Sequence, residues 1–410
     1  MRIDHVEAKQ ILDTRGRATL ETTLLANTLS ATASVPSGKS TGSHEALELR
    51  DPDGSVAQAI GNVNGEIAKA IVGRRFDTPG DLDAFLIELD GTPNKSRLGA
   101  NAILSVSIAA MRLSAFLQDI PLWSAIAKRG GFTATAPRLY VNVMNGGAHA
   151  DFKLPFQEYL LVIEGKTSEA FPLAQELFAK LGELLSKSDV DSNCRHLIST
   201  NGVPMGDEGG YAPTFDTIEK PFEILSSLIA GHPNVSLAID AAASELLHGG
   251  VYQLLGKSYS PDELATLYRE LVERFPIHSI EDPFAENAPD DFAQLNTTLG
   301  QQILIIGDDL TVTDPVRIKD AAEHKAINAV LIKPNQIGTV REALEAVKET
   351  YVASFQAVAS HRSGETGDTF IADFAYGVGA HGLKAGGFAQ KERLVKYERL
   401  MAIERETAAV

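Results

Sequence analysis

Five short apolar runs from residue 235 onward, each ending at a charged residue, constrain the fold more than any other feature. The charged residues are Asp240, Glu281, Asp308, Lys333 and His361, at intervals of 41, 27, 25 and 28 residues. Each interval has room for one strand and one helix, and runs that are apolar throughout are typical of parallel strands buried on both faces. Repeated units of this kind predict an α/β fold built around a parallel β/α barrel.

The N-terminal part of the chain has a different pattern. Residues 18–25 read as a strand, and residues 101–110 form an apolar segment typical of a buried helix. A chain of 410 residues also exceeds what one hydrophobic core usually organises. Because the pattern breaks near residues 128–133, we expect a smaller α+β domain over residues 1–130 and the barrel over residues 131–410.

The composition argues against several classes of partner. The formal net charge is −17, whereas nucleic acids and anionic membranes attract a positive surface. No apolar run approaches the roughly 20 residues that span a bilayer, and the single cysteine, Cys194, cannot form an internal disulfide. We therefore expect a cytoplasmic protein that binds neither nucleic acid nor membrane. A small anionic ligand remains compatible, because a metal ion and a few cations can reverse the potential locally.

Three of the five strand ends carry a carboxylate, namely Asp240, Glu281 and Asp308. In a β/α barrel these ends meet at one mouth, where active sites are found. Each carboxylate alone is more simply explained as the cap of a following helix. Three in register would repel one another, which favours a shared cation, and their hard oxygen atoms suit Mg²⁺.

Positive and hydroxyl groups follow at the later strand ends. Lys333 is a usable base if a metal and neighbouring cations favour its neutral form; the alternative is a structural ion pair. His361, Arg362 and Ser363 offer groups suited to a phosphate, or else form a polar turn. Lys384 is either a further cation of the site or a solvated lysine.

Two glycine-rich loops supply further candidates. Residues 206–210 carry two acids, one of them Glu208, where a flexible backbone can approach a ligand closely. Residues 145–149 present His149 in a similar setting. For both loops the alternative is an ordinary surface turn.

Two motif matches are interpreted as coincidental. The Gly38-Lys39-Ser40 tripeptide lacks the earlier glycine of a phosphate-binding P-loop, because that position holds Ala33. Residues 377–382 match GxGxxG, but the chain that follows is too short for a dinucleotide-binding unit. Neither match carries a functional assignment.

Motifs distributed over nearly the whole chain resemble those of the enolase family. They occupy residues 36–42, 45–51, 89–92, 94–96, 99–104, 145–147, 157–158, 206–210, 279–283, 335–339 and 360–366. So many motifs in one order are highly specific. The resemblance implies an enolase-type β/α barrel and a hydro-lyase (phosphopyruvate hydratase). Such an enzyme reversibly dehydrates 2-phosphoglycerate to phosphoenolpyruvate in glycolysis and gluconeogenesis, with two Mg²⁺ in its active site.

The resemblance also implies metal ligands and an acid–base pair. The residues that would hold the first Mg²⁺ are Asp240, Glu281 and Asp308. Ser40, on a closing loop, would help bind the second Mg²⁺. Lys333 would remove the proton from C2 of the substrate, and Glu208, supported by Glu158, would protonate the departing 3-hydroxyl.

Substrate contacts follow from the same resemblance. Arg362 and Ser363 would hold the phosphate, while His149 and Lys384 would contribute charge and closure during catalysis. The full set of residues that would contact the substrate is His149, Gln157, Glu158, His361, Arg362, Ser363 and Lys384.

The chain departs from the family pattern in the loop near residue 39 and at the expected subunit interface. Lys39 stands where a small alanine is usual. The family pairs charges of an N-terminal strand with the partner subunit's C-terminal helix. Here Lys9 would face Arg405, and Glu21 would face Ala402. We therefore expect a homodimer with an altered interface.

Two alternative functions stay open from the sequence. One is a diverged relative that acts on another phosphorylated or carboxylated acid. The other is a protein that binds a phosphate-containing ligand without turnover, for which residues 38–40 offer the best support. The complete set of acid, base and metal residues favours an enzyme.

Overall fold

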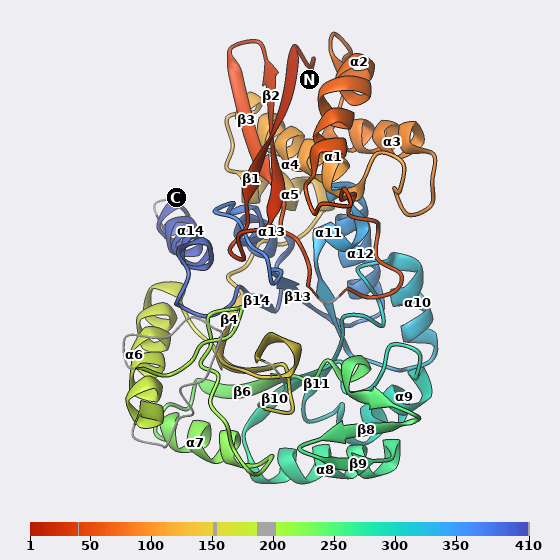
Figure 1. Ribbon diagram of the computed structural model, residues 1–410. Coiled ribbons are helices and arrows are strands. Elements are labelled where there is room, and N and C mark those ends of the chain that lie inside the picture. The colour runs from red at the N-terminus through yellow and green to blue at the C-terminus, as the bar shows by residue number, and fades with distance from the viewer. Residues whose placement is uncertain (40, 151–153, 187–201, 409–410) are drawn as a thin grey trace.

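The computed structural model describes residues 1–39, 41–150, 154–186 and 202–408. They form a small domain of strands and helices seated on a larger barrel (Figure 1). The predicted metal ligand Ser40 lies outside the described residues, as does Cys194.

A three-stranded antiparallel sheet builds the N-terminal domain, in the order β1 (His5–Leu12), β2 (Ala18–Ala26) and β3 (Leu29–Ser34). The predicted strand at residues 18–25 is β2, whose burial alternates along most of its length. The predicted helix at residues 101–110 lies within α4 (Ala100–Leu117), which packs on β2 and β3. The other helices here are α1 (Ala57–Asn62), η1 (Val63–Ile67), α2 (Ala68–Ile71), α3 (Pro79–Asp90) and α5 (Leu122–Gly130).

Helix α3 shows how local sequence sets the ends of a helix. The Thr78 hydroxyl accepts a hydrogen bond from the Asp81 amide at 3.2 Å, and the Asp81 carboxylate accepts one from the Thr78 amide at 2.9 Å. This capping box satisfies amides that the helix leaves unpaired, and Pro79 needs no partner at the first helical position. The helix ends at Gly91, whose φ of 70° suits glycine.

Helix α4 joins the two parts of the molecule. Among the described residues it is the one helix long and apolar enough to cross a bilayer, yet 78% of it is buried inside the protein. Arg112 of this helix pairs with Asp368 of the barrel segment at 2.6 Å. A buried core helix can be as apolar as a membrane helix, so the burial of α4 inside the protein accounts for its apolar composition.

Eight strands close into a barrel in the order β10-β11-β12-β13-β14-β4-β5-β6. Their bounds are β4 (Arg138–Asn145), β5 (Glu158–Ile163), β6 (Val235–Asp240), β10 (Ile277–Glu281), β11 (Leu304–Gly307), β12 (Ala329–Ile332), β13 (Gln356–Ser360) and β14 (Gly382–Lys384). All five predicted apolar runs are barrel strands, with ends that differ by at most one residue from the structure. The expected barrel and its α/β class are confirmed.

The expectation of an entirely parallel barrel is wrong for one strand. β5 runs antiparallel to both β4 and β6. The reason is local, because the backbone bond from the Gly146 amide to the Gln157 carbonyl folds the connection between β4 and β5 into a hairpin. As a consequence, Glu158 at the start of β5 lies opposite Asp240 at the end of β6.

An outer ring of helices surrounds the barrel, as Figure 1 shows for α6 to α10. The helices are α6 (Thr167–Ser186), α7 (Lys220–Leu228), α8 (Pro261–Arg274), α9 (Pro289–Leu299), α10 (Pro315–Glu323), α11 (Pro334–Ile337), α12 (Val340–Val352), α13 (Phe370–Val378) and α14 (Lys391–Ala408). A small sheet of β7 (Leu247–His248), β8 (Val251–Leu254) and β9 (Lys257–Tyr259) follows the short helix η3 (Ala243–Leu246).

The connection between the two parts begins later than the predicted break at residues 128–133. Lys128 and Arg129 lie in the last turn of α5, and Gly131 ends that helix with a φ of 72°. Only residues 131–137 then lead into β4. α5 also packs against α13, so the N-terminal helices and the barrel share a buried surface.

Candidate active site

The predicted charged residues converge at one mouth of the barrel. Glu281 pairs in register with Asp240 on the neighbouring strand, and Ser360 pairs with Lys384. A small polar cavity at this mouth is lined by His149, Gln157, Glu158, Glu208, Asp240, Asp308, Lys333, Ser360, His361, Arg362, Ser363 and Lys384. Of the predicted site residues within the described part of the chain, only Glu281 is absent from this lining, and it contacts Lys384 directly.

Lys384 lies at the centre of the carboxylate cluster. Its ammonium is 2.8 Å from Glu281, 3.0 Å from Glu158 and 3.1 Å from Asp240. Burial alone would lower the pKa of Lys384, but these carboxylates raise it well above its usual value. The interpretation of Lys384 as a solvated lysine is therefore wrong, because its side chain is only 3% exposed.

The cluster holds more acid than one lysine can neutralise. Burial raises the pKa of Glu281 well above its usual value, and the neighbouring Asp240 adds to the shift. Burial also raises the pKa of Glu158, and among the neighbouring charges Glu208 has the largest effect. An excess of buried carboxylate oxygens suits a divalent cation, so the residues present fit the Mg²⁺ that the sequence predicts.

Helix capping does not explain Glu281 or Asp308. The N-cap positions of the helices that follow them are occupied by Ala288 and Asp314. Among the described residues, two groups have ligand atoms within 4.8 Å of one another: His149, Glu158 and Glu208, and Asp282, Asp308 and Asp309. Acidic groups able to hold a metal therefore occur at the mouth, and Asp308 belongs to one of them.

Lys333 follows β12 and contacts the Asp308 carboxylate directly. Burial and the nearby Arg362 lower the pKa of Lys333, but Asp308 raises it, and the net shift is upward. The hypothesis of a neutral Lys333 required a metal as well as neighbouring cations, and without a metal the effect of Asp308 is larger than that of Arg362. A cation that balanced the charge of Asp308 would remove the largest contribution that raises the pKa of Lys333.

Glu208 faces two imidazoles. Its carboxylate oxygens lie 3.3 Å from Nε2 of His361 and 3.7 Å from Nδ1 of His149. Burial would raise the pKa of Glu208, but these histidines lower it well below its usual value. Burial in turn lowers the pKa of His361 to about 4. A carboxylate beside two imidazoles provides the residue types used in general acid–base catalysis.

Arg362 is oriented by the N-terminal domain. Its guanidinium bonds both oxygens of Glu45, at 2.8 and 3.1 Å, and also bonds Asn335 at 3.2 Å. Burial would lower the pKa of Arg362, but Glu45 raises it. The fork geometry fixes the guanidinium plane beside Ser363. Sequence reasoning gave Glu45 and Asn335 no role, although both lie in the recognised motifs.

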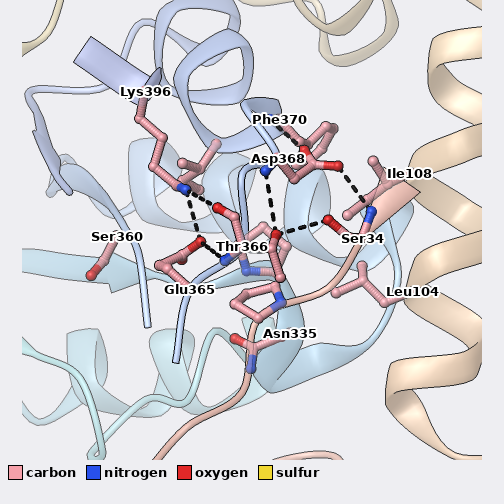
Figure 2. A pocket seen from close by; sticks show the side chains of 13 residues that line it. Ser34, Leu104, Ile108, Asn335, Ser360, Glu365, Thr366, Asp368, Phe370 and Lys396 are labelled. Carbon is pink, nitrogen blue, oxygen red and sulfur yellow. Dashed lines mark hydrogen bonds and ion pairs between the residues drawn. The ribbon is translucent and has the colours of Figure 1, made fainter. Parts of the chain in front are cut away.

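A second layer of buried polar residues supports the Arg362–Ser363 loop, and Figure 2 shows these residues around a small pocket. Lys396 of α14 pairs with Glu365 at 2.8 Å, and Glu365 accepts a bond from the Arg362 amide at 3.0 Å. Ser34 of β3 bonds Thr366 at 2.8 Å. The loop is thus held from both the C-terminal helix and the N-terminal sheet.

Arg393 is a further residue that sequence reasoning missed. It is fully buried on α14 and donates to the Ser363 carbonyl at 2.9 Å and the Asp207 carbonyl at 3.2 Å. It also contacts Nδ1 of His361. No spacing in the sequence brings α14 to the barrel mouth, so nothing in the one-dimensional pattern marks this arginine.

Several polar side-chain atoms of the residues that line the cavity have no hydrogen-bond partner within the protein. In the described part of the chain, these buried atoms are His149 Nδ1, Gln157 Oε1, Glu158 Oε2, His361 Nε2 and Ser363 Oγ. Buried polar atoms without partners are costly and uncommon in native proteins. The acceptors Gln157 Oε1 and Glu158 Oε2 suit a hydroxyl group or a cation, whereas the positive groups above suit an anionic group of a ligand.

The two coincidental motif matches have no supporting structure. The next helix after residues 38–39 begins only at Ala57, so these residues do not precede a helix as a P-loop does. Residues 377–382 run from the end of α13 into β14, the last barrel strand. Nucleotide binding by either motif is therefore not supported.

Two family models match almost the whole chain. One, described as the enolase N-terminal domain, covers residues 3–126, and the other, described as the enolase C-terminal TIM barrel domain, covers residues 133–410. The chain is 42% identical to the enolase of Anaplasma phagocytophilum over 99% of this chain and 95% of that protein. It is 43% identical to the enolase of Methanopyrus kandleri, over 99% and 96%. It is 41% identical to that of Thermococcus kodakarensis, over 100% and 96%.

Proposed function

Because the chain belongs to the enolase family, we propose that it is a hydro-lyase that reversibly dehydrates 2-phosphoglycerate to phosphoenolpyruvate. The observation that carries this proposal is the convergence, at one barrel mouth, of a lysine, a carboxylic acid group and a phosphate-sized cationic loop. A reaction that removes a proton and expels a hydroxide from a phosphorylated acid requires these three elements. The use of Mg²⁺ by the family is consistent with the acidic groups at the mouth.

The opposed positions of acid and base support the proposed chemistry. Lys333 follows β12 and Glu158 begins β5, and three strands separate β12 from β5 in either direction around the barrel. Glu208 lies on the β5 side, with its carboxylate 3.4 Å from Asn142 of β4. In this proposal Lys333 removes the C2 proton from one side. Glu208, supported by Glu158, protonates the departing 3-hydroxyl from the other.

Two Mg²⁺ are part of the proposal. The residues that would hold the first are Asp240, Glu281 and Asp308, and Ser40 would help hold the second. Bound Mg²⁺ supplies positive charge that stabilises negative charge developing on the substrate. The chain's own contribution is to keep hard oxygen ligands buried on three adjacent strands, next to the charge of Lys384.

The remaining residues are proposed to bind the substrate. Arg362 and Ser363 hold its phosphate, since the guanidinium is pre-oriented by Glu45 and the Ser363 hydroxyl has no hydrogen-bond partner among the described residues. His149, Gln157 and His361 complete the wall of the cavity. Orientation by fixed groups of this kind lowers the entropic cost of reaching the reactive geometry.

We also propose a homodimer with an altered interface and a cytoplasmic location. Lys9 and Glu21, which the family pairs with the partner subunit, form an ion pair with each other at 2.8 Å here. Exposed pairs of this kind contribute about 0–1 kcal/mol, so dimerisation depends on other contacts. Light scattering at micromolar concentration tests this proposal, and a monomer would contradict it.

The formation of phosphoenolpyruvate, followed by its absorbance, tests the catalytic proposal. We expect turnover of 2-phosphoglycerate with Mg²⁺ and none after EDTA treatment. Lys333→Ala should abolish exchange of the C2 proton while Mg²⁺ binding persists. Absence of turnover in the wild type would reject the proposal, and turnover of a different phosphorylated or carboxylated acid would favour a diverged relative. Binding of a phosphate ligand without any turnover would favour a binding protein.

A further inference from the structure

Lys39 makes two contacts that an alanine at this position could not make. Its ammonium is 2.7 Å from the Asp207 carboxylate and 2.9 Å from the Ala148 carbonyl. Asp207 directly precedes Glu208, and Ala148 directly precedes His149. One side chain of the N-terminal domain therefore reaches both the loop that carries the proposed acid, Glu208, and the loop that carries His149.

These two barrel loops are already fixed relative to each other. The Asp207 amide donates to the His149 carbonyl at 3.3 Å. The Asp207 carbonyl accepts from Arg393 at 3.2 Å, and Arg393 is fully buried. The carboxylate that Lys39 contacts thus extends from a rigid backbone.

The residues just before Lys39 are attached to the Arg362–Ser363 loop. Ser37 and Gly364 exchange two backbone hydrogen bonds, of 2.8 and 2.9 Å. Arg15 donates to the carbonyls of Ser37 and Gly38 at 3.2 and 3.3 Å. From Ser37 to Lys39 the chain therefore runs from the Arg362–Ser363 side of the mouth to the Glu208 side.

We propose that Lys39 is a positioning residue of this enzyme. The Lys39 bridge, defined as the Lys39 ammonium with the Asp207 carboxylate and the Ala148 carbonyl, ties the N-terminal loop to the Glu208 and His149 loops before substrate binds. These loops are then already ordered before substrate binds, so binding does not have to order them, and KM is lower. The side chains of Lys39 and Asp207 are 39% and 21% exposed. Because exposed ion pairs are weak, we expect the bridge to lower KM by only about two- to fivefold.

A direct contact between Lys39 and the substrate phosphate is the competing explanation, and Asp207→Asn separates the two. If the bridge operates, Lys39→Ala and Asp207→Asn each raise KM by about two- to fivefold and leave kcat nearly unchanged. The double variant then resembles either single variant, because both remove the same interaction. If Lys39 binds substrate directly, Asp207→Asn frees the ammonium and lowers KM.

The experiment combines steady-state kinetics on 2-phosphoglycerate with hydrogen–deuterium exchange of the ligand-free protein. We expect Lys39→Ala to speed exchange at the amides of residues 206–211, and Lys39→Arg to restore both exchange and KM. The control is Lys180→Ala, which breaks an exposed ion pair with Glu176 on α6. It should change neither exchange at residues 206–211 nor KM.

Two outcomes would overturn the proposed role of Lys39: a lower KM in Asp207→Asn, or unchanged exchange at residues 206–211 in Lys39→Ala. Since this role rests on the proposed function, the wild type provides a separate criterion. A wild type without turnover rejects the function, while faster exchange in Lys39→Ala would still support the bridge.

Discussion

Asp83 is expected to make the stability of this protein fall as the pH rises from about 4 to 6. It lies on α3, is 1% exposed, and accepts a hydrogen bond from the Arg341 amide of α12 at 2.9 Å. Burial raises the pKa of Asp83 from its usual 3.8 to about 6, against the opposing effects of its hydrogen bonds. Within the described residues, its other carboxylate oxygen makes no hydrogen bond.

The sign follows from proton binding in the two states. Between pH 3.8 and 6 the folded protein keeps the Asp83 proton and the unfolded chain has released it. The free energy of unfolding therefore falls as the pH rises through this range. A shift of about two units corresponds to about 3 kcal/mol at pH 7. For a chain of this length that is a difference of roughly 3 °C in Tm.

Asp83→Asn removes this titration while keeping the shape of the side chain. As the pH rises from 4 to 7, we expect the unfolding free energy of the variant to increase by about 2 kcal/mol relative to that of the wild type, in addition to any difference that does not depend on pH. Denaturant unfolding of both proteins at several pH values measures this change, with the exposed Asp290→Asn as the control. A free-energy difference between wild type and Asp83→Asn that is independent of pH from 4 to 7 would refute the reasoning.

Four other outcomes are expected. Glu281→Gln should weaken Mg²⁺ binding by roughly tenfold or more, measured by calorimetry, because a buried anionic ligand is lost; unchanged affinity would remove it from the metal site. Arg362→Lys should raise KM by about tenfold, since the two-pronged bond to Glu45 and the planar fork are lost; wild-type KM would argue against phosphate binding there. Arg112→Ala should cost about 3 kcal/mol of unfolding free energy by leaving Asp368 buried without its partner, and a smaller loss on denaturant unfolding would show that water replaces the pair. EDTA should abolish turnover and added Mg²⁺ restore it, and residual turnover in EDTA would contradict a metal requirement.

The barrel and most of its mouth could be predicted from sequence because the relevant pattern is local. A buried parallel strand must be apolar along its whole length, so the runs ending at Asp240, Glu281 and Asp308 are visible without coordinates. The barrel rule then places their ends together, and the structure agrees.

Residues that act through long-range contacts could not be predicted in this way. Glu158 lies at the start of its strand, and it reaches the mouth only because β5 is antiparallel. The family resemblance supplied this residue, whereas the rule about strand ends would have missed it. Arg393 and Glu45 come from a distant helix and a distant loop, so their contacts with the site depend on how those segments pack.

By itself the sequence determined that strands alternate with helices and which charged side chains follow the strands, because hydrophobic periodicity and strand length are properties of neighbouring residues. Only the tertiary structure decided the charge state of those side chains and the partners that hold them. Lys333 illustrates the difference: its position was evident from the pattern, but its ion pair with Asp308 is a long-range contact that raises its pKa. Lys39 likewise stood out in the sequence as an unusual residue, and its link to Asp207 and Ala148 arises only where the N-terminal loop meets the barrel. Electrostatic free energies depend on distance and burial, and both are set by packing between segments far apart in the chain.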